Sequence, residues 1–258
     1  MTTKLDEHIS FIGKCVLIED EFLTGGKKIR RRILVLGDLH LGYEDSSLGI
    51  PMRMIFQETL EDLRKVFGAV EKKKGFGAGK GEVDEIVILG DVKHFFGGIL
   101  DQEWKETRKF FSYLKEKCKK IIVVKGNHDT ILEPIAREFG FELADYYLLG
   151  KYGFLHGDKM FDALLEKKIK VFFCGHLHPA ITLREGVKSE RYKCFLAGSW
   201  RGKKVIVLPS FFPLVEGADV LIWEGNLGFD FSIEKSEVYL VGDAEVLYFG
   251  KMGKFVRG

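Results

Sequence analysis

The sequence contains very little asparagine and glutamine. Asparagine occurs only at Asn127 and Asn226 and glutamine only at Gln57 and Gln102, while 30% of the 258 residues are charged. Scarcity of heat-labile amides beside abundant lysine and glutamate indicates a thermophilic source. In such a chain, an asparagine placed between a glycine and a histidine, as Asn127 is, suggests that this position needs a specific amide.

Cysteine is also scarce, and the four cysteines are isolated from one another, at Cys15, Cys118, Cys174 and Cys194. Without a CxxC pair, neither a disulfide framework nor a thiolate zinc site is expected, so we predict reduced thiols. No apolar run approaches the roughly 18 to 20 residues that cross a bilayer. Residues 1–8 are too polar for a signal peptide. We therefore expect a cytoplasmic protein that does not bind a membrane.

A strong charge of one sign is absent as well, because the formal net charge is only +2. The sequence thus gives no global field for attracting nucleic acid. Local basic runs occur at 27–32, 72–74 and 115–120. Such runs most often form solvated faces, and this interpretation is favoured over a patch that binds phosphate backbones.

Short apolar runs rich in β-branched residues predict strands buried on both faces. They lie at 33–36, 86–89, 121–124 and 171–174. Between them, apolar periodicity predicts helices at 52–67, 104–118 and 131–139, the last with Asp129 or Thr130 as its N-cap. This alternation of strands and helices predicts an α/β fold.

After residue 175 the pattern becomes rich in strands, which predicts a second sheet. The expected strands are 180–184, 193–197, 205–208, 220–223 and 238–241. The glycine- and lysine-rich segment 71–81 is interpreted as a mobile loop within one domain that spans 1–258.

Five predicted strands each end in a turn that contains a glycine and a side chain able to bind metal. Ligands of an open α/β sheet gather beyond the carboxyl ends of its strands, so these turns are expected to converge. The turns are Asp38-Leu39-His40, Gly90-Asp91, Gly126-Asn127-His128-Asp129, His156-Gly157 and Gly175-His176-Leu177-His178.

The donor set of these turns consists of carboxylates, an amide and imidazoles, which suits Mn²⁺, Fe or Zn²⁺. On an extended segment, alternation would place Asp38 and His40 on the same side. Asp38 and Asp91 would supply only two negative charges against the four positive charges of two divalent ions. The remaining positive charge would attract a phosphate oxygen and lower the pKa of a bound water.

Each turn alone has a simpler explanation. Asp-x-His can be a turn carboxylate beside a surface histidine, His-x-His a structural zinc pair, and Gly-Asn-His-Asp a helix cap. Together they favour a metal centre, because five of the seven histidines fall in these turns.

The ordered set of these motifs resembles the calcineurin-like metallophosphoesterase superfamily over about residues 30–210. The run from Gly37-Asp38-Leu39-His40 to Pro51-Met52-Arg53 is similar to archaeal phosphoesterases related to the SbcD nuclease subunit. Cys174-Gly175-His176-Leu177-His178-Pro179-Ala180 and Pro209-Ser210-Phe211-Phe212-Pro213-Leu214 are similar to bacterial ligase-associated phosphoesterases.

The resemblance implies a four-layer αββα sandwich with two mixed sheets and a metal site at the carboxyl ends of the strands. It also implies two divalent ions, Mn²⁺ first, with Fe, Zn²⁺ or Ni²⁺ as alternatives. One ion would be held by Asp38, His40, Asp91 and His178, and the other by Asp91, Asn127, His156 and His176. His128 would be the catalytic histidine, with Asp129 orienting its ring.

One departure from the superfamily pattern follows Asp91, where an acidic residue is often found two or three positions later. Here the sequence continues with Val92-Lys93-His94. Lys93 or His94 is therefore a candidate contact for substrate phosphate, and a surface or supporting role for His94 stays open. Arg53 is a further candidate.

The implied activity is a metal-dependent phosphoesterase that hydrolyses phosphodiester bonds of nucleic acids or nucleotides, with a hydroxide that bridges two metals as nucleophile. The alternatives are a phosphomonoesterase and a metal-stabilised, non-catalytic partner in a DNA-processing complex. The strand-rich extension 217–258 is too short for the DNA-capping parts of a full nuclease subunit, and a homodimer contact is one role open to it.

Overall fold

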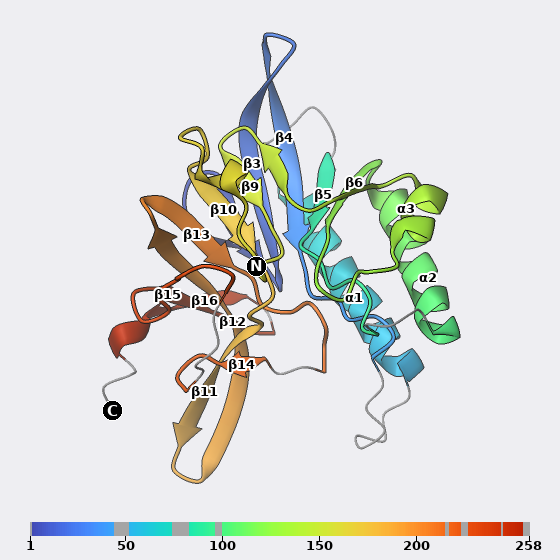
Figure 1. Cartoon of the computed structure of the whole chain (residues 1–258). Coiled ribbons are helices and arrows are strands. Elements are labelled where there is room, and N and C mark those ends of the chain that lie inside the picture. Colours follow the sequence, from blue (N-terminus) through green and yellow to red (C-terminus); the bar gives the residue numbers. More distant parts are fainter. Residues whose placement is uncertain are drawn as a thin grey trace.

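The computed structural model describes residues 2–43, 52–73, 83–95, 100–214, 217–222, 227–243 and 245–254. Its strands form two mixed β-sheets that pack against each other, and the α-helices gather beside the first sheet (Figure 1). Most of the loop expected at 71–81 lies outside the described residues.

The first sheet has the strand order β1-β2-β3-β4-β5-β6-β7. Its strands are β1 (Thr3–Lys4), β2 (Ile9–Ile12), β3 (Cys15–Thr24), β4 (Lys27–Leu36), β5 (Glu85–Ile88), β6 (Lys120–Val124) and β7 (Glu142–Ala144). Strands β1 to β4 are antiparallel neighbours, whereas β4 to β7 run parallel. The carboxyl ends of β4, β5 and β6 therefore meet at one edge, which we name the carboxyl edge.

The outer face of this sheet is covered by α1 (Met52–Lys72), α2 (Asp101–Lys117) and α3 (Glu133–Phe139) (Figure 1). Alternation along β4 explains the layering. Leu34 and Leu36 pack with the helices, whereas Ile33 and Val35 pack toward the second sheet. All four side chains are fully buried. Both faces of the strand are apolar because the sheet lies between two layers.

The second sheet runs in the order β14-β11-β12-β13-β10-β9-β8, and β15 joins β16 to β12. Its strands are β8 (Tyr147–Leu149), β9 (Tyr152–Phe154), β10 (Val171–Cys174), β11 (Pro179–Glu185), β12 (Lys188–Trp200), β13 (Lys203–Val207), β14 (Ala218–Asp219), β15 (Glu237–Val241) and β16 (Val246–Lys251). Strands β9, β10 and β13 are parallel, and β9 and β10 also end at the carboxyl edge.

The predicted α/β fold with two mixed sheets is confirmed. One detail differs, because the outer face of the second sheet packs against 3₁₀ helices and loops in the described part of the chain. These are η1 (Asp162–Leu165), η2 (Met252–Lys254) and the loop that contains Phe229.

Two local predictions were wrong, and part of the first sheet was not predicted. Val220, Leu221 and Ile222 form a turn after the short strand β14, instead of a strand. Helix α3 begins at Glu133, with Leu132 as its N-cap, so neither Asp129 nor Thr130 caps it. Strands β1 to β3 were not predicted, and β4 extends back through the basic run 27–32.

This basic run lies on a strand whose arginines are paired with acidic residues. Arg30 contacts Glu21, Arg31 contacts the buried Glu85, and Arg32 contacts Glu19. The charge of this run is therefore largely neutralised. This argues against a patch that binds phosphate backbones at residues 27–32. Among the described residues, no helix is both long and apolar enough to cross a membrane.

Candidate metal centre

The five turns predicted from the sequence converge at the carboxyl edge. The turn after β4 carries Asp38 and His40, and the turn after β5 carries Asp91. The turns after β6, β9 and β10 carry the remaining predicted ligands, which are Asn127, His156, His176 and His178.

A first group of donor atoms belongs to Asp38, His40, Asp91 and His178, whose ligand atoms all lie within 4.8 Å of one another. Nε2 of His178 lies 3.2 Å from Oδ1 of Asp38 and 3.3 Å from Nε2 of His40. Nε2 of His40 lies 3.8 Å from Oδ2 of Asp91. These atoms surround a volume in which one cation could be bound by two carboxylates and two imidazoles.

A second group shares Asp91 with the first and adds His156 and His176. Nε2 of His156 lies 3.5 Å from Oδ2 of Asp91 and 3.1 Å from Nδ1 of His176. The amide oxygen of Asn127 lies 3.0 Å from the same nitrogen of His156. The carboxylate of Asp91 is therefore common to both groups of donor atoms.

The backbone at the ligand positions is unusual. Six non-glycine residues of the described chain have a positive φ, and five of them are predicted ligands: Asp38, His40, Asp91, His176 and His178, with φ between 43° and 66°. Left-handed conformations of such residues cost about 1–3 kcal/mol each and concentrate at functional sites. The expectation of alternation along an extended segment was therefore wrong, and single left-handed turns bring these side chains together.

Glycines next to the ligands allow the turns to touch. A Cβ atom on Gly126 would lie 2.2 Å from Oδ1 of Asp91, and one on Gly175 would lie 2.3 Å from Oδ2 of Asp38. Any larger residue at these two positions would push a ligand out of place. The glycines are thus required by close approach to the carboxylates.

Main-chain hydrogen bonds lock the turns together. The amide of His40 donates to the carbonyl of Asp91, and the amide of His176 donates to both carboxylate oxygens of Asp38, which joins the two sheets. Nδ1 of His156 lies 2.7 Å from the carbonyl oxygen of Leu89. A proton on that nitrogen leaves Nε2, on the side of Asp91, unprotonated and with a lone pair free to bind a metal ion.

Burial and mutual repulsion set the protonation of the centre. Burial acts to raise the pKa of Asp38, but the imidazoles of His178, His156 and His40 outweigh it and lower this pKa to about 2. Burial raises the pKa of Asp91, and the charge of Asp38 adds to that effect.

The pKa of His40 lies well below its usual value because of burial and the neighbouring His178. The pKa of His156 is raised despite its burial, since Asp38 and Asp91 favour its charged form. Cations would neutralise the two carboxylates and take the place of protons on the imidazoles. The nitrogen and oxygen donors, the buried carboxylates and the shared Asp91 all fit such cations.

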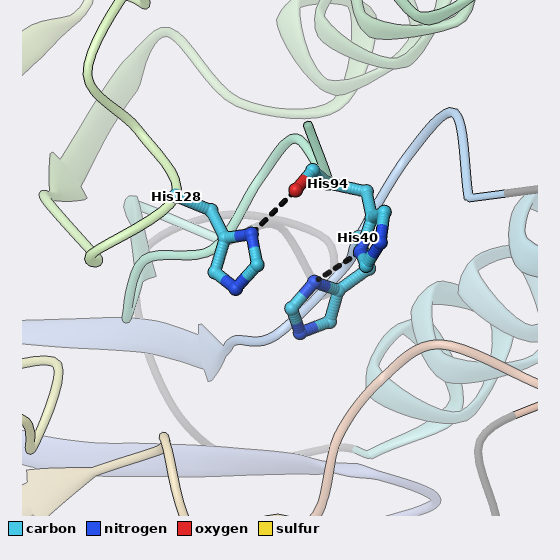
Figure 2. A group of neighbouring side chains, drawn as sticks. All are labelled: His40, His94 and His128. Atoms are coloured by element: carbon cyan, nitrogen blue, oxygen red, sulfur yellow. Dashed lines mark hydrogen bonds between the residues drawn. The ribbon is translucent and has the colours of Figure 1, made fainter. Parts of the chain in front are cut away.

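A third group of neighbouring rings consists of His40, His94 and His128 (Figure 2). Nδ1 of His94 lies 3.3 Å from Nδ1 of His40, and Nδ1 of His128 contacts the carbonyl oxygen of His94 (Figure 2). The rings of His94 and His128 are stacked with centroids 5.4 Å apart. His94 thus positions one predicted ligand through its ring and the predicted catalytic histidine through its backbone.

The contacts of Asp129 are with backbone amides, and its role in orienting the ring of His128 stays a prediction. Its carboxylate accepts hydrogen bonds from the backbone amides of Gly126, Val92 and Lys93. Burial, followed by the charge of Asp91, raises the pKa of Asp129 to about 7. Its observed contacts tie the turn after β5 to the turn after β6.

The candidate substrate contacts differ in placement. The side chain of Lys93 is fully buried, and its amine donates to the carbonyl of Phe95, so it is turned away from solvent. His94 is half-buried beside His128, and burial lowers its pKa. Arg53 lies in the first turn of α1, but its side chain is outside the described residues.

Several supporting residues were not assigned a role from the sequence. The buried carboxylate of Glu103 in α2 accepts hydrogen bonds from the amides of His94, Phe95 and Leu100, so it holds the His94 loop. Acidic residues are common in the first turn of helices, so the position of Glu103 in the sequence did not indicate a role at the metal centre. No local pattern could show that this carboxylate reaches a loop that precedes its own helix.

The segment 209–213 packs against the turn that carries Asp38 and His40. The hydroxyl of Ser210 donates to the carbonyl of Asp38, and the ring of Phe212 contacts Tyr43 and His40 edge-on. The amine of Lys193 donates to the carbonyls of Ser210 and Phe212. The Pro-Ser-Phe-Phe-Pro motif was therefore the only sign in the sequence that this segment has a role. Only the structure shows that the segment supports the turn of Asp38 and His40.

Comparison with known proteins shows the family and the fold of this chain. The model of the calcineurin-like phosphoesterase family matches residues 31–162, just over half of the chain. Comparison of the sequence with curated proteins gave no significant match.

One solved structure in particular shows the same fold. A nuclease of Pseudomonas putida, named MPE, aligns with a TM-score of 0.56 and 18% identity, over 89% of this chain and 100% of its own. Two others align less closely. The phosphoesterase YfcE of E. coli has 17% identity and a TM-score of 0.37, over 82% of this chain and 88% of its own. Zinc-bound Vps29 of Entamoeba histolytica has 14% identity and a TM-score of 0.36, over 83% and 94%.

The extent of the family match includes the turns that carry Asp38, His40, Asp91, Asn127 and His156. The chain therefore belongs to the calcineurin-like phosphoesterase family, whose members are metal-dependent hydrolases of phosphoric esters.

Proposed function

We propose that this protein hydrolyses phosphodiester bonds, in nucleic acids or nucleotides, with two divalent metal ions. The observation that carries the proposal is the pair of donor groups that share the carboxylate of Asp91. The name of one structural neighbour, a nuclease, agrees with a nucleic-acid substrate. Mn²⁺ is the first candidate ion, because the donors are nitrogen and oxygen.

In this proposal Asp38, His40, Asp91 and His178 hold one ion, and Asp91, Asn127, His156 and His176 hold the other. Bound there, such ions supply an acidified water and offset the negative charge that develops on phosphate oxygens.

His128 is the proposed general acid. Its Nδ1 is engaged by the carbonyl of His94, and its Nε2 lies 3.9 Å from Oδ2 of Asp91, which places this nitrogen beside the shared carboxylate. A proton on Nε2 would be donated to the departing oxygen of the ester. The ring of His94, stacked on His128, is the proposed contact for a phosphate oxygen of the substrate.

The experiment is an activity panel with the protein first freed of metal and then supplied with Mn²⁺, Zn²⁺, Fe²⁺, Ni²⁺ or Mg²⁺. The substrates are bis-p-nitrophenyl phosphate, p-nitrophenyl phosphate, a single-stranded oligonucleotide, a duplex and a cyclic nucleotide. We expect diester hydrolysis that depends on the added ion. Turnover of the monoester alone would replace the proposal with a phosphomonoesterase.

His128→Ala separates catalysis from metal binding. The proposal requires this variant to keep both ions, measured by elemental analysis, while kcat falls by roughly a hundredfold to ten-thousandfold. If the wild-type protein binds metal but turns over none of the substrates, a non-catalytic role in a DNA-processing complex becomes the better explanation.

A further inference from the structure

An exposed tyrosine and a partly buried phenylalanine meet near the turns that carry Asn127 and His156. The rings of Tyr146 and Phe161 lie with centroids 5.1 Å apart at an angle of 42°. Nζ of Lys159 lies 5.5 Å from the centroid of Phe161. Tyr146 is 37% exposed, and Lys159 is also exposed, so solvent reaches both the aromatic and the cationic part.

The chain fixes this cluster close to two predicted ligands. Tyr146 follows β7, and the amide of Lys125, two residues before Asn127, donates to the carbonyl of Ala144 at 2.8 Å. Tyr147, the next residue, pairs with Phe154 of β9, two residues before His156. Tyr146 therefore sits where the chain passes from the first sheet to the second, between the turns of Asn127 and His156.

Phe161 reaches the same place through the loop that leaves His156. This loop is held tightly, because a Cβ on Gly157 would lie 3.2 Å from Cβ of His176, and Gly157 has φ +125°. A Cβ on Gly228 would lie 2.3 Å from Cα of Lys159. The amide of Gly228 also donates to the carbonyl of Gly157 at 2.7 Å. The loop is thus clamped between a ligand turn and a second loop.

An aromatic pair with an adjacent cation matches the chemistry of single-stranded nucleic acid. Bases stack on exposed rings with little preference for sequence, while lysine contacts the backbone phosphates. On this basis we propose that Tyr146, Phe161 and Lys159 form a subsite that stacks a base next to the scissile phosphate. This inference rests on the proposed phosphodiesterase function and adds a preference for substrates that carry a base.

Two diesters with the same leaving group test the subsite. One is the p-nitrophenyl ester of thymidine 5′-phosphate, and the other is p-nitrophenyl methyl phosphate, which has no base. We expect wild-type protein to have a higher kcat/KM for the thymidine ester. Tyr146→Leu and Phe161→Leu should each lower that advantage by roughly tenfold, mainly through KM, while leaving the methyl ester within about twofold.

A matched control is Tyr248→Leu, which removes a ring that is 56% exposed on β16, at the other side of the second sheet. It should leave both substrates unchanged. Tyr146→Leu is the variant less expected to disturb folding, because the ring of Tyr146 is exposed. Phe161, in contrast, packs partly against the outer core of the second sheet.

Binding without turnover gives an independent readout. In EDTA, fluorescence anisotropy compares a labelled oligothymidine with an abasic strand of the same length. The subsite predicts tighter binding of oligothymidine by wild-type protein and loss of that difference in Tyr146→Leu. Equal binding of both strands by wild-type protein, or equal effects of the variants on both p-nitrophenyl esters, would overturn the subsite.

The two proposals fail in different ways. Absence of hydrolysis of either ester would reject the proposed function, and the anisotropy comparison would still decide the subsite. Hydrolysis of both esters with no advantage for the thymidine ester would reject the subsite alone.

Discussion

Buried carboxylates occur at both ends of the sheets, and their surroundings differ. At the end opposite the carboxyl edge, the fully buried Glu85 contacts Arg31 and Lys120. Asp20 accepts a hydrogen bond from Tyr152 at 2.6 Å and contacts Lys151 at 2.8 Å. These charges are neutralised by lysine and arginine, so the end opposite the carboxyl edge is arranged for stability.

At the carboxyl edge, Asp38 and Asp91 are surrounded by imidazoles and backbone amides. Within the described part of the chain, neither of them pairs with a lysine or arginine. Their turns also have left-handed backbones. Burial of a carboxylate alone therefore does not mark a functional site, whereas burial without a permanent cation, on strained turns, does.

Asp91→Asn should have the largest effect on function. Because Asp91 belongs to both donor groups, we expect kcat/KM to fall by about a thousandfold or more, together with loss of bound metal measured by elemental analysis. Stability in EDTA should be unchanged or higher, because burial already raises the pKa of Asp91 and disfavours its charge. A large drop in the unfolding temperature in EDTA would mean that Asp91 is chiefly structural, and the contrast between the two ends would be lost.

His94→Ala should have an intermediate effect. The variant removes the ring that contacts His40 and stacks on His128, but it keeps the backbone carbonyl that His128 contacts. Loss of such a supporting partner usually costs about tenfold to a hundredfold in metal affinity or activity. Calorimetric titration with Mn²⁺ and steady-state kinetics measure the two losses separately.

The matched control is His8→Ala, which removes a histidine at the opposite end, where it contacts Asp20. This variant should leave kcat/KM and metal affinity unchanged. If His94→Ala also changes neither quantity, His94 has no positioning role, and its place beside His40 is incidental.

Much of the metal centre at the carboxyl edge could be predicted from the sequence, because it depends on which residues follow the apolar strands. The turns after 33–36, 86–89 and 121–124 were placed correctly, since parallel strands must end at the same edge. The reason given for the pairing of Asp38 with His40 was wrong, because positive φ values arise from contacts between turns, such as that of Gly126 with Asp91.

Long-range supports could not be predicted. Glu103 and Ser210 act on loops that are close in space through tertiary packing, and their own local sequence gives no sign of it. Strand β3 escaped detection because Glu19, Asp20 and Glu21 interrupt its apolar pattern. Their partners are Arg32, Tyr152 and Arg30, on β4 and β9, so the charges become acceptable only after both sheets have formed.

Asp20→Asn should have the smallest effect on function and a moderate one on stability. The variant weakens the contacts with Tyr152 and Lys151, and we expect it to lower the free energy of unfolding by about 1–2 kcal/mol near neutral pH. Activity per folded molecule should be unchanged. Urea unfolding followed by circular dichroism measures the first quantity, and kinetics measures the second.

The stability difference between wild-type protein and Asp20→Asn should also depend on pH. Although burial opposes it, the hydrogen bonds from Lys151 and Tyr152 lower the pKa of Asp20 below the usual value for an aspartate. A carboxylate with a lowered pKa in the folded state stabilises the fold above its unfolded pKa, and this contribution is lost as the pH falls through the folded pKa. The difference should therefore be constant above about pH 5 and shrink below about pH 4. A difference that persists unchanged in acid would show that Asp20 acts through its shape and not through its charge, and the two ends of the sheets would then differ less than the structure indicates.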